Sequence, residues 1–177
     1  MAPHIGLLRK INDGVAIGVG MALLACVVFT LIEIALRRLG GSLGGVDEIS
    51  GYVMAVTTSW GISYALTERA HVRIDLLRTA LFPAGRALFD AIAMGCLAAT
   101  AIAVAYRGWS VLEKTLATGA RANTPLETPL WLPQSLWWAG WVWFALSASL
   151  LMLAILSNLV QRKFAAVDAI AGVRAET

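Results

Sequence analysis

One ionisable residue, Glu33, lies inside a long apolar stretch of the sequence that extends from about residue 15 to residue 36. A carboxylate within a membrane-crossing helix is costly and usually marks a proton or substrate site. Glu33 lies near the end of the stretch, however, four residues before Arg37, and at this spacing two side chains share one helix face. We therefore favour an intramembrane ion pair between Glu33 and Arg37, with a proton-carrying Glu33 as the alternative.

The densest group of ionisable residues lies between the second and third apolar stretches. Glu68, His71, Arg73 and Asp75 alternate there with apolar residues. Apolar side chains on one side and arginines on the other are typical of a helix that lies along a membrane surface. We expect an interfacial amphipathic segment, with His71 at a surface or subunit interface. Because the second histidine is in the N-terminal tail, a haem-binding anchor is a weaker alternative.

Other residue types that could carry chemistry lack the necessary spacing. Cys26 and Cys96 fall in the middle of apolar stretches, where cysteine behaves as a small hydrophobic residue. The sequence contains no phosphate-binding loop and no HExxH or GxSxG motif, and its carboxylates are not clustered at metal-ligand spacing. We expect no enzyme activity, no catalytic residue, no metal and no cofactor in this chain.

The composition requires a membrane. The chain has 177 residues, of which 59% are hydrophobic and 14% charged, whereas soluble domains are roughly 45–50% apolar and about 25% charged. A spanning helix needs about 20 largely apolar residues. Four stretches qualify, at about 15–36, 49–67, 88–106 and 133–160, and helical spacing carries the third towards 118. We predict an all-α integral membrane protein with four transmembrane helices in a single domain, 1–177, and cytoplasmic tails at 1–12 and 163–177.

The orientation follows from the distribution of lysine and arginine, which are more frequent in cytoplasmic segments. The side that holds both termini carries Arg9, Lys10, Arg69, Arg73, Arg78, Arg86, Arg162, Lys163 and Arg174, and the other side carries Arg37, Arg38, Arg107, Lys114 and Arg121. Both termini should therefore be cytoplasmic. The net charge of +3 reflects this asymmetry, and no basic stripe with interleaved aromatic residues indicates nucleic-acid binding.

The second apolar stretch has a polar stripe at helical spacing, where lipid-facing positions would be Leu, Val or Phe. We expect this stripe to pack against protein, and the acidic residues before it to favour the start of a helix. Together with the charged segment that follows, the candidate interface residues are Asp47, Glu48, Tyr52, Thr57, Gly61, Tyr64, Glu68, His71, Arg73 and Asp75.

Tryptophans gather around the start of the last apolar stretch. Aromatic residues of this kind are enriched at membrane–water interfaces. The candidate interfacial anchors are Trp131, Trp137, Trp138, Trp141 and Trp143. A belt needs fewer than these five, so contact of some of them with a partner is the alternative.

The layout and two motifs resemble the small membrane subunit of tripartite ATP-independent periplasmic (TRAP) transporters, the DctQ-type family. The resemblance covers nearly the whole chain and is most specific over residues 47–77, DEISGYVMAVTTSWGISYALTERAHVRIDLL. The shared features are an acidic pair, Tyr52, small residues around Gly61 and the run from His71 to Leu77. The segment from Thr124 to Pro133 resembles the entry to the family's fourth helix. Glu68-Arg69-Ala70 departs from the small residues of many relatives.

The resemblance implies a scaffold subunit of a secondary symporter in the bacterial inner membrane. A large membrane permease subunit would carry the sites for substrate and for the coupling ion, expected to be sodium. A periplasmic substrate-binding protein would dock transiently and deliver an organic acid, and membrane lipid would surround the complex. The competing hypothesis is a self-contained four-helix proton-coupled exporter that uses Glu33.

Overall fold

The computed structural model describes residues 3–69 and 81–171 of the chain. Five helices account for most of these residues. They are α1 (Pro3–Arg38), α2 (Val46–Thr67), α4 (Pro83–Thr118), α5 (Trp131–Val160) and α6 (Phe164–Ala171). The only strand pairing in the described part of the chain is an isolated bridge between Arg121 and Pro129. The predicted all-α class is confirmed.

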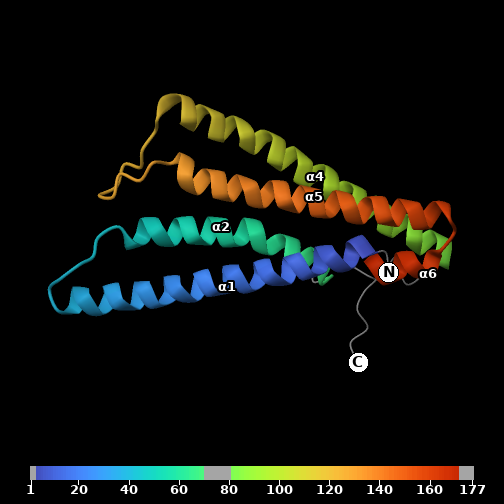
Figure 1. Cartoon of the computed structure of the whole chain (residues 1–177), viewed down its shortest axis with the longest axis horizontal. Coiled ribbons are helices and arrows are strands. Elements are labelled where there is room, and N and C mark those ends of the chain that lie inside the picture. The colour runs from blue at the N-terminus through green and yellow to red at the C-terminus, as the bar shows by residue number, and fades with distance from the viewer. Residues whose placement is uncertain (1–2, 70–80, 172–177) are drawn as a thin grey trace.

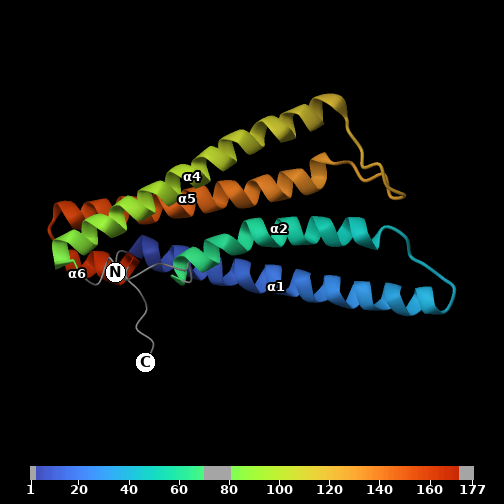
Figure 2. The same cartoon turned by 180° about the vertical axis from the view of Figure 1, so that it is seen from behind.

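The four long helices lie side by side in the order α1, α2, α5, α4 (Figure 1). In this layer α2 packs against α1 and α5, α4 packs against α5, and the short α6 contacts both α4 and α5. Figure 2 shows the same layer from behind. The loops at 39–45 and 119–130 lie at one end, which we call the loop end. The start of α1 and helix α6 lie at the other, which we call the terminal end.

Three of the helices are long and apolar enough to cross a membrane, namely Ile5–Arg38, Pro83–Thr118 and Trp131–Val160. At about 1.5 Å per residue, α2 is also long enough. Helix α2 is not among the three helices apolar enough to cross a membrane, because its serine, threonine and glycine residues lower its mean hydropathy. The fourth span therefore stays a prediction, as does the cytoplasmic placement of the termini.

Both predicted tails contain helix in their described residues. Helix α1 begins at Pro3 rather than near residue 15, because Leu8 and Asn12 are buried against the rest of the chain and extend the packed face backwards. Residues 164–171 form α6 rather than a tail, because Val167 and Ala171 are buried against α4 and α5.

The other helix boundaries differ less from the prediction. Helix α4 begins at Pro83 rather than near residue 88, because proline suits the first turn, where its missing N–H is not needed. The extension to residue 118 is present, and Gly119 ends the helix in a left-handed conformation (φ 60°). Helix α2 begins at Val46 and α5 at Trp131, both slightly earlier than expected.

The core lies towards the terminal end, where small side chains of α4 meet larger ones of α5. Ala91 and Ala98 of α4 are buried, as are Phe144 and Ile155 of α5. Small residues let two helices approach closely when no water is available to drive them together. By contrast, none of the most apolar part of α1 is buried. That surface must therefore be covered by lipid or by another protein.

Candidate functional site

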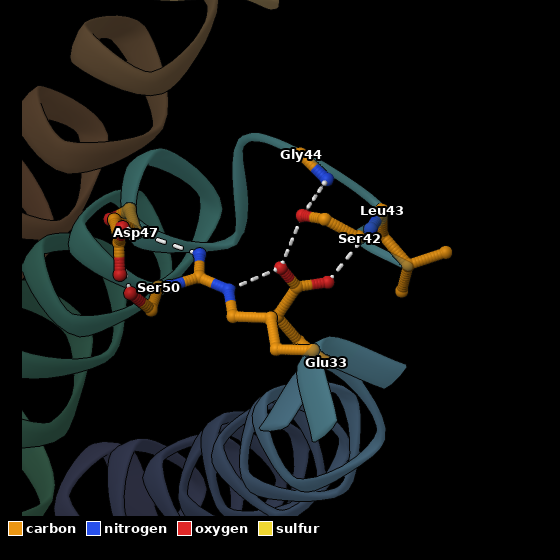
Figure 3. A network of polar contacts seen from close by, with 7 residues as sticks. Glu33, Ser42, Leu43, Gly44, Asp47 and Ser50 are labelled. Carbon is orange, nitrogen blue, oxygen red and sulfur yellow. Dashed lines mark hydrogen bonds and ion pairs between the residues drawn. The ribbon is translucent and has the colours of Figure 1, made fainter. Parts of the chain in front are cut away.

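The carboxylate of Glu33 is the centre of a polar network at the loop end of α1 (Figure 3). Its Oε1 accepts hydrogen bonds from Arg37 Nε at 2.7 Å and from Ser42 Oγ at 2.6 Å. Its Oε2 accepts one from the backbone N–H of Leu43 at 2.7 Å. The Glu33 side chain is only 3% exposed, whereas that of Arg37 is 56% exposed. The structure thus brings Glu33 and Arg37 together and uses the carboxylate to hold the loop that follows α1.

The same network reaches the start of α2. Arg37 Nη2 lies 4.0 Å from Asp47 Oδ2. Within the loop, the Gly44 N–H donates a hydrogen bond to Ser42 Oγ at 3.2 Å. In Figure 3, Glu33 extends from the end of its helix towards this loop. All of these contacts lie at the loop end of the layer rather than at its mid-depth. The exporter hypothesis, which needs Glu33 as a mobile proton carrier, therefore gains no support.

Glu33→Gln should lower the melting temperature of the purified chain in detergent, by about 2–4 °C. The amide keeps one acceptor but turns an N–H₂ group towards donors, so at least one of the three hydrogen bonds that the carboxylate accepts is lost. Asp47→Asn is the matched control, because the Asp47 side chain is 97% exposed and should change the melting temperature little. Equal melting temperatures for Glu33→Gln and the wild type would contradict this structural role.

The two loops at the loop end are joined through Glu48, in the first turn of α2. Tyr52 donates its hydroxyl to Glu48 Oε1 at 2.9 Å, and the Thr124 hydroxyl donates to Glu48 Oε2. Nearby, Leu126 packs so closely over Gly45 that a β-carbon there would lie 2.3 Å from Leu126 Cδ1. The backbone of Gly45 also has a positive φ of 69°. Contacts from the loop at 119–130 thus fix the start of α2, the helix that follows the loop at 39–45.

The hydrogen bonds to Glu48 lower the pKa of its carboxyl group. Donation from Thr124, and then from Thr128, lowers the pKa of Glu48 below its usual range. A lowered pKa in the folded state stabilises the fold above the ordinary value of about 4.3, and this stabilisation is lost as the pH falls through the lowered pKa.

We therefore expect the wild-type chain to melt at a lower temperature at pH 3 than at pH 7. Glu48→Gln should reduce this difference, because glutamine does not titrate. Glu127→Gln, which alters an exposed carboxylate on the loop at 119–130, should leave the difference unchanged. Thermal melts at the two pH values measure the effect, and an identical pH dependence in all three proteins would show that the Glu48 contacts do not contribute.

The structure places the other predicted interface residues of α2 in different surroundings. Thr57 is buried and its hydroxyl bonds to the Met54 carbonyl of its own helix, whereas Tyr64 is 37% exposed. Gly61 is partly buried with open space above it, and Glu68 forms an ion pair with Arg9 at 2.6 Å. Within this chain α2 packs mainly through other residues, namely Val46, Ser59, Ser63 and Leu66. A role of the stripe towards a partner stays a prediction.

Three predicted interface residues, His71, Arg73 and Asp75, lie outside the described residues. So does most of the proposed interfacial segment.

The five candidate anchor tryptophans do not form a uniform exposed belt. Trp131 is 45% exposed, but the other four are partly buried. Trp138 donates to the Ala105 carbonyl of α4 at 2.8 Å, and its ring lies 5.1 Å from that of Trp109. Trp143 donates to Asn12 Oδ1, also at 2.8 Å. At least these two indoles therefore join helices of this chain.

Asn12 is an important residue that the sequence did not reveal. It is fully buried, and its amide donates to the Ser63 carbonyl at 3.1 Å and to Thr67 Oγ1 at 3.4 Å while its oxygen accepts from Trp143. It therefore ties α1 to both α2 and α5. The predicted tail at 1–12 includes Asn12, although its spacing of four residues from Leu8 continues the helical pattern of α1.

Comparison with known proteins identifies one family. The sequence model of the tripartite ATP-independent periplasmic transporters, DctQ component, matches residues 24–164, which include all of α2, α4 and α5 and the part of α1 from residue 24 onward. No curated protein and no solved structure matches the chain. The matched range includes the Glu33 network, the Glu48 junction and the tryptophans of α5. The chain therefore belongs to the DctQ family, the small membrane subunits of TRAP transporters.

Proposed function

We propose that this chain is the scaffold subunit that holds the large membrane permease of a TRAP transporter in the bilayer. The transporter would take up an organic acid delivered by a periplasmic substrate-binding protein. The large permease would bind the substrate and the coupling ion, which we propose is sodium, and this chain would need no cofactor. It would reside in the bacterial inner membrane as four spanning helices with both termini in the cytoplasm.

The observation that carries this proposal is that hydrogen bonds within the chain hold the Glu33 carboxylate in place. An ionisable residue inside a membrane span is a site hypothesis by default. Here three donors occupy its carboxylate at the end of α1, and all three come from the helix end and the adjoining loop. The other buried polar contacts described above, at Asn12 and Trp138, join helices. Such contacts support rigidity rather than passage of a solute.

The shape of the chain also supports a scaffold. The helices form a layer, and the open surface of α1 carries many large apolar side chains, among them Ile17, Met21, Leu24 and Leu31. A layer of this kind has far more surface for lipid and protein contacts than a closed four-helix bundle. A rigid layer with wide apolar faces suits a subunit that braces another membrane protein.

Isolation of the tagged chain from its native membrane tests the proposal. The large permease should co-purify at a constant ratio, and the ratio should persist on size-exclusion chromatography in mild detergent. A chain carrying Gly140→Leu, which should separate α2 from α5 as argued below, should recover less of the large permease. Purification of this chain without the large permease, from membranes that contain both, would contradict the scaffold role.

A further inference from the structure

An apolar groove follows α2 inward from the loop end of the layer. It has a volume of about 220 Å³ and lies between three helices. Ala22 of α1, Val53 and Val56 of α2, and Leu132 and Leu136 of α5 line it. In a chain that spans a bilayer, a groove with such walls is an environment for hydrocarbon rather than for water.

A carboxylate, that of Glu48, lies next to two of the residues that line this groove. Tyr52 and Thr128 line the groove, and both donate hydrogen bonds to Glu48. Glu48, Tyr52 and Val56 are spaced by four residues, so they follow one face of α2 from its first turn inward. No cationic side chain in the described part of the chain forms an ion pair with Glu48, whose hydrogen-bond donors are hydroxyl groups and the backbone N–H of Thr128. The site therefore has negative charge at the helix end and apolar walls below it.

We propose that this groove binds one acyl chain of a phospholipid that carries a primary ammonium in its headgroup. The ammonium would pair with Glu48, and the acyl chain would lie along Val53 and Val56 towards Ala22. A phospholipid presents the same order of groups, with charge at the membrane interface and hydrocarbon beneath it. Charge complementarity selects the headgroup, because a carboxylate attracts an ammonium and disfavours a headgroup that is only anionic. The inference requires only that the chain lies in a bilayer, so it does not depend on the scaffold role.

Native mass spectrometry of the full chain tests this proposal. The chain is purified with thorough delipidation, and phosphatidylethanolamine or phosphatidylglycerol is then added. The wild type should retain one phosphatidylethanolamine about tenfold more strongly than phosphatidylglycerol. Glu48→Gln should remove this preference, because glutamine keeps a hydrogen-bond acceptor but loses the charge. Ala22→Trp should reduce the retention of both lipids, because the indole fills the groove from α1.

Two matched controls separate this site from general lipid contact. Val27→Trp places an indole in a second apolar groove between α1 and α2, lined also by Leu23 and Met54, and should retain phosphatidylethanolamine as the wild type does. Glu127→Gln removes a carboxylate of the loop at 119–130 and should do the same. Because Ala22→Trp leaves Glu48 intact, it tests the site even if Glu48→Gln loosens the loops.

Three results would overturn the proposal. The first is equal retention of the two lipids by the wild type, which would indicate non-selective lipid contact. The second is unchanged retention in Ala22→Trp. The third is retention of neither lipid by the wild type, which would mean that side chains of another protein fill the groove.

Discussion

Gly140→Leu should destabilise the chain by about 3 kcal/mol or more, because overpacking at a rigid contact exceeds the usual cost of about 1–3 kcal/mol. At Gly140 the helices α2 and α5 touch almost backbone to backbone. A β-carbon there would lie 2.4 Å from Ser59 Oγ and 2.9 Å from the Ser59 carbonyl carbon. The backbone of α2 cannot turn aside as a flexible side chain could, so α2 and α5 must separate. Denaturant titration of the purified chain in detergent measures the loss.

Gly61→Ala is the matched control for this variant. Gly61 lies in α2 with nothing within 4 Å of its would-be β-carbon, so alanine should be neutral or stabilise the helix by up to about 1 kcal/mol. The separation of α2 from α5 should also break the bond from Trp60 Nε1 to the Leu136 carbonyl, now 2.9 Å long. The intrinsic tryptophan fluorescence, to which Trp60 and six other tryptophans contribute, should therefore change in Gly140→Leu but not in Gly61→Ala. Equal stability of the two variants would show that α2 and α5 do not pack as described.

Asn12→Ala should have the second largest effect, a loss of about 1–3 kcal/mol. The substitution removes the contacts that tie α1 to α2 and α5, and it leaves the partly buried indole N–H of Trp143 without its acceptor, which carries a penalty of that size. Trp143→Phe should lose less on its own, and the double variant should lose less than the two single variants combined. A double-mutant cycle of unfolding free energies measures this coupling.

Asn158→Ala provides the control for removing an asparagine amide. Within the described residues the Asn158 amide donates to its own helix, at the Ala154 carbonyl (2.8 Å), so its loss should change the unfolding free energy little. Additive effects of Asn12→Ala and Trp143→Phe would contradict the contact between α1 and α5.

Sequence reasoning recovered the features that depend on neighbouring residues. The apolar stretches give the helices, and the spacing of four residues between Glu33 and Arg37 brings their side chains together on one helix. Apolar residues continue at helical spacing beyond residue 106, and Gly119 follows them, so the end of α4 could be predicted. These features can be read locally because helix geometry relates residues three and four positions apart without reference to the rest of the fold.

The features that sequence reasoning missed depend on the order of helices in the layer. Asn12 and Trp143 are 131 positions apart, and they meet because α1 and α5 both flank α2. The hydroxyl of Thr124 reaches Glu48 across 76 positions because the two loops share one end of the layer. The helical structure within the two predicted tails was not predicted for the same reason. A charged helix end remains helical when a few of its residues, such as Leu8, are buried by distant elements.

The measurement that tests the scaffold role most directly is uptake into proteoliposomes. The large permease is reconstituted with its substrate-binding protein, the organic acid and a sodium gradient, with and without this chain. The scaffold role predicts uptake only when this chain is present, no transport by this chain alone, and unchanged coupling in Glu33→Gln. Full uptake by the large permease without this chain, or transport by this chain alone that Glu33→Gln abolishes, would contradict it.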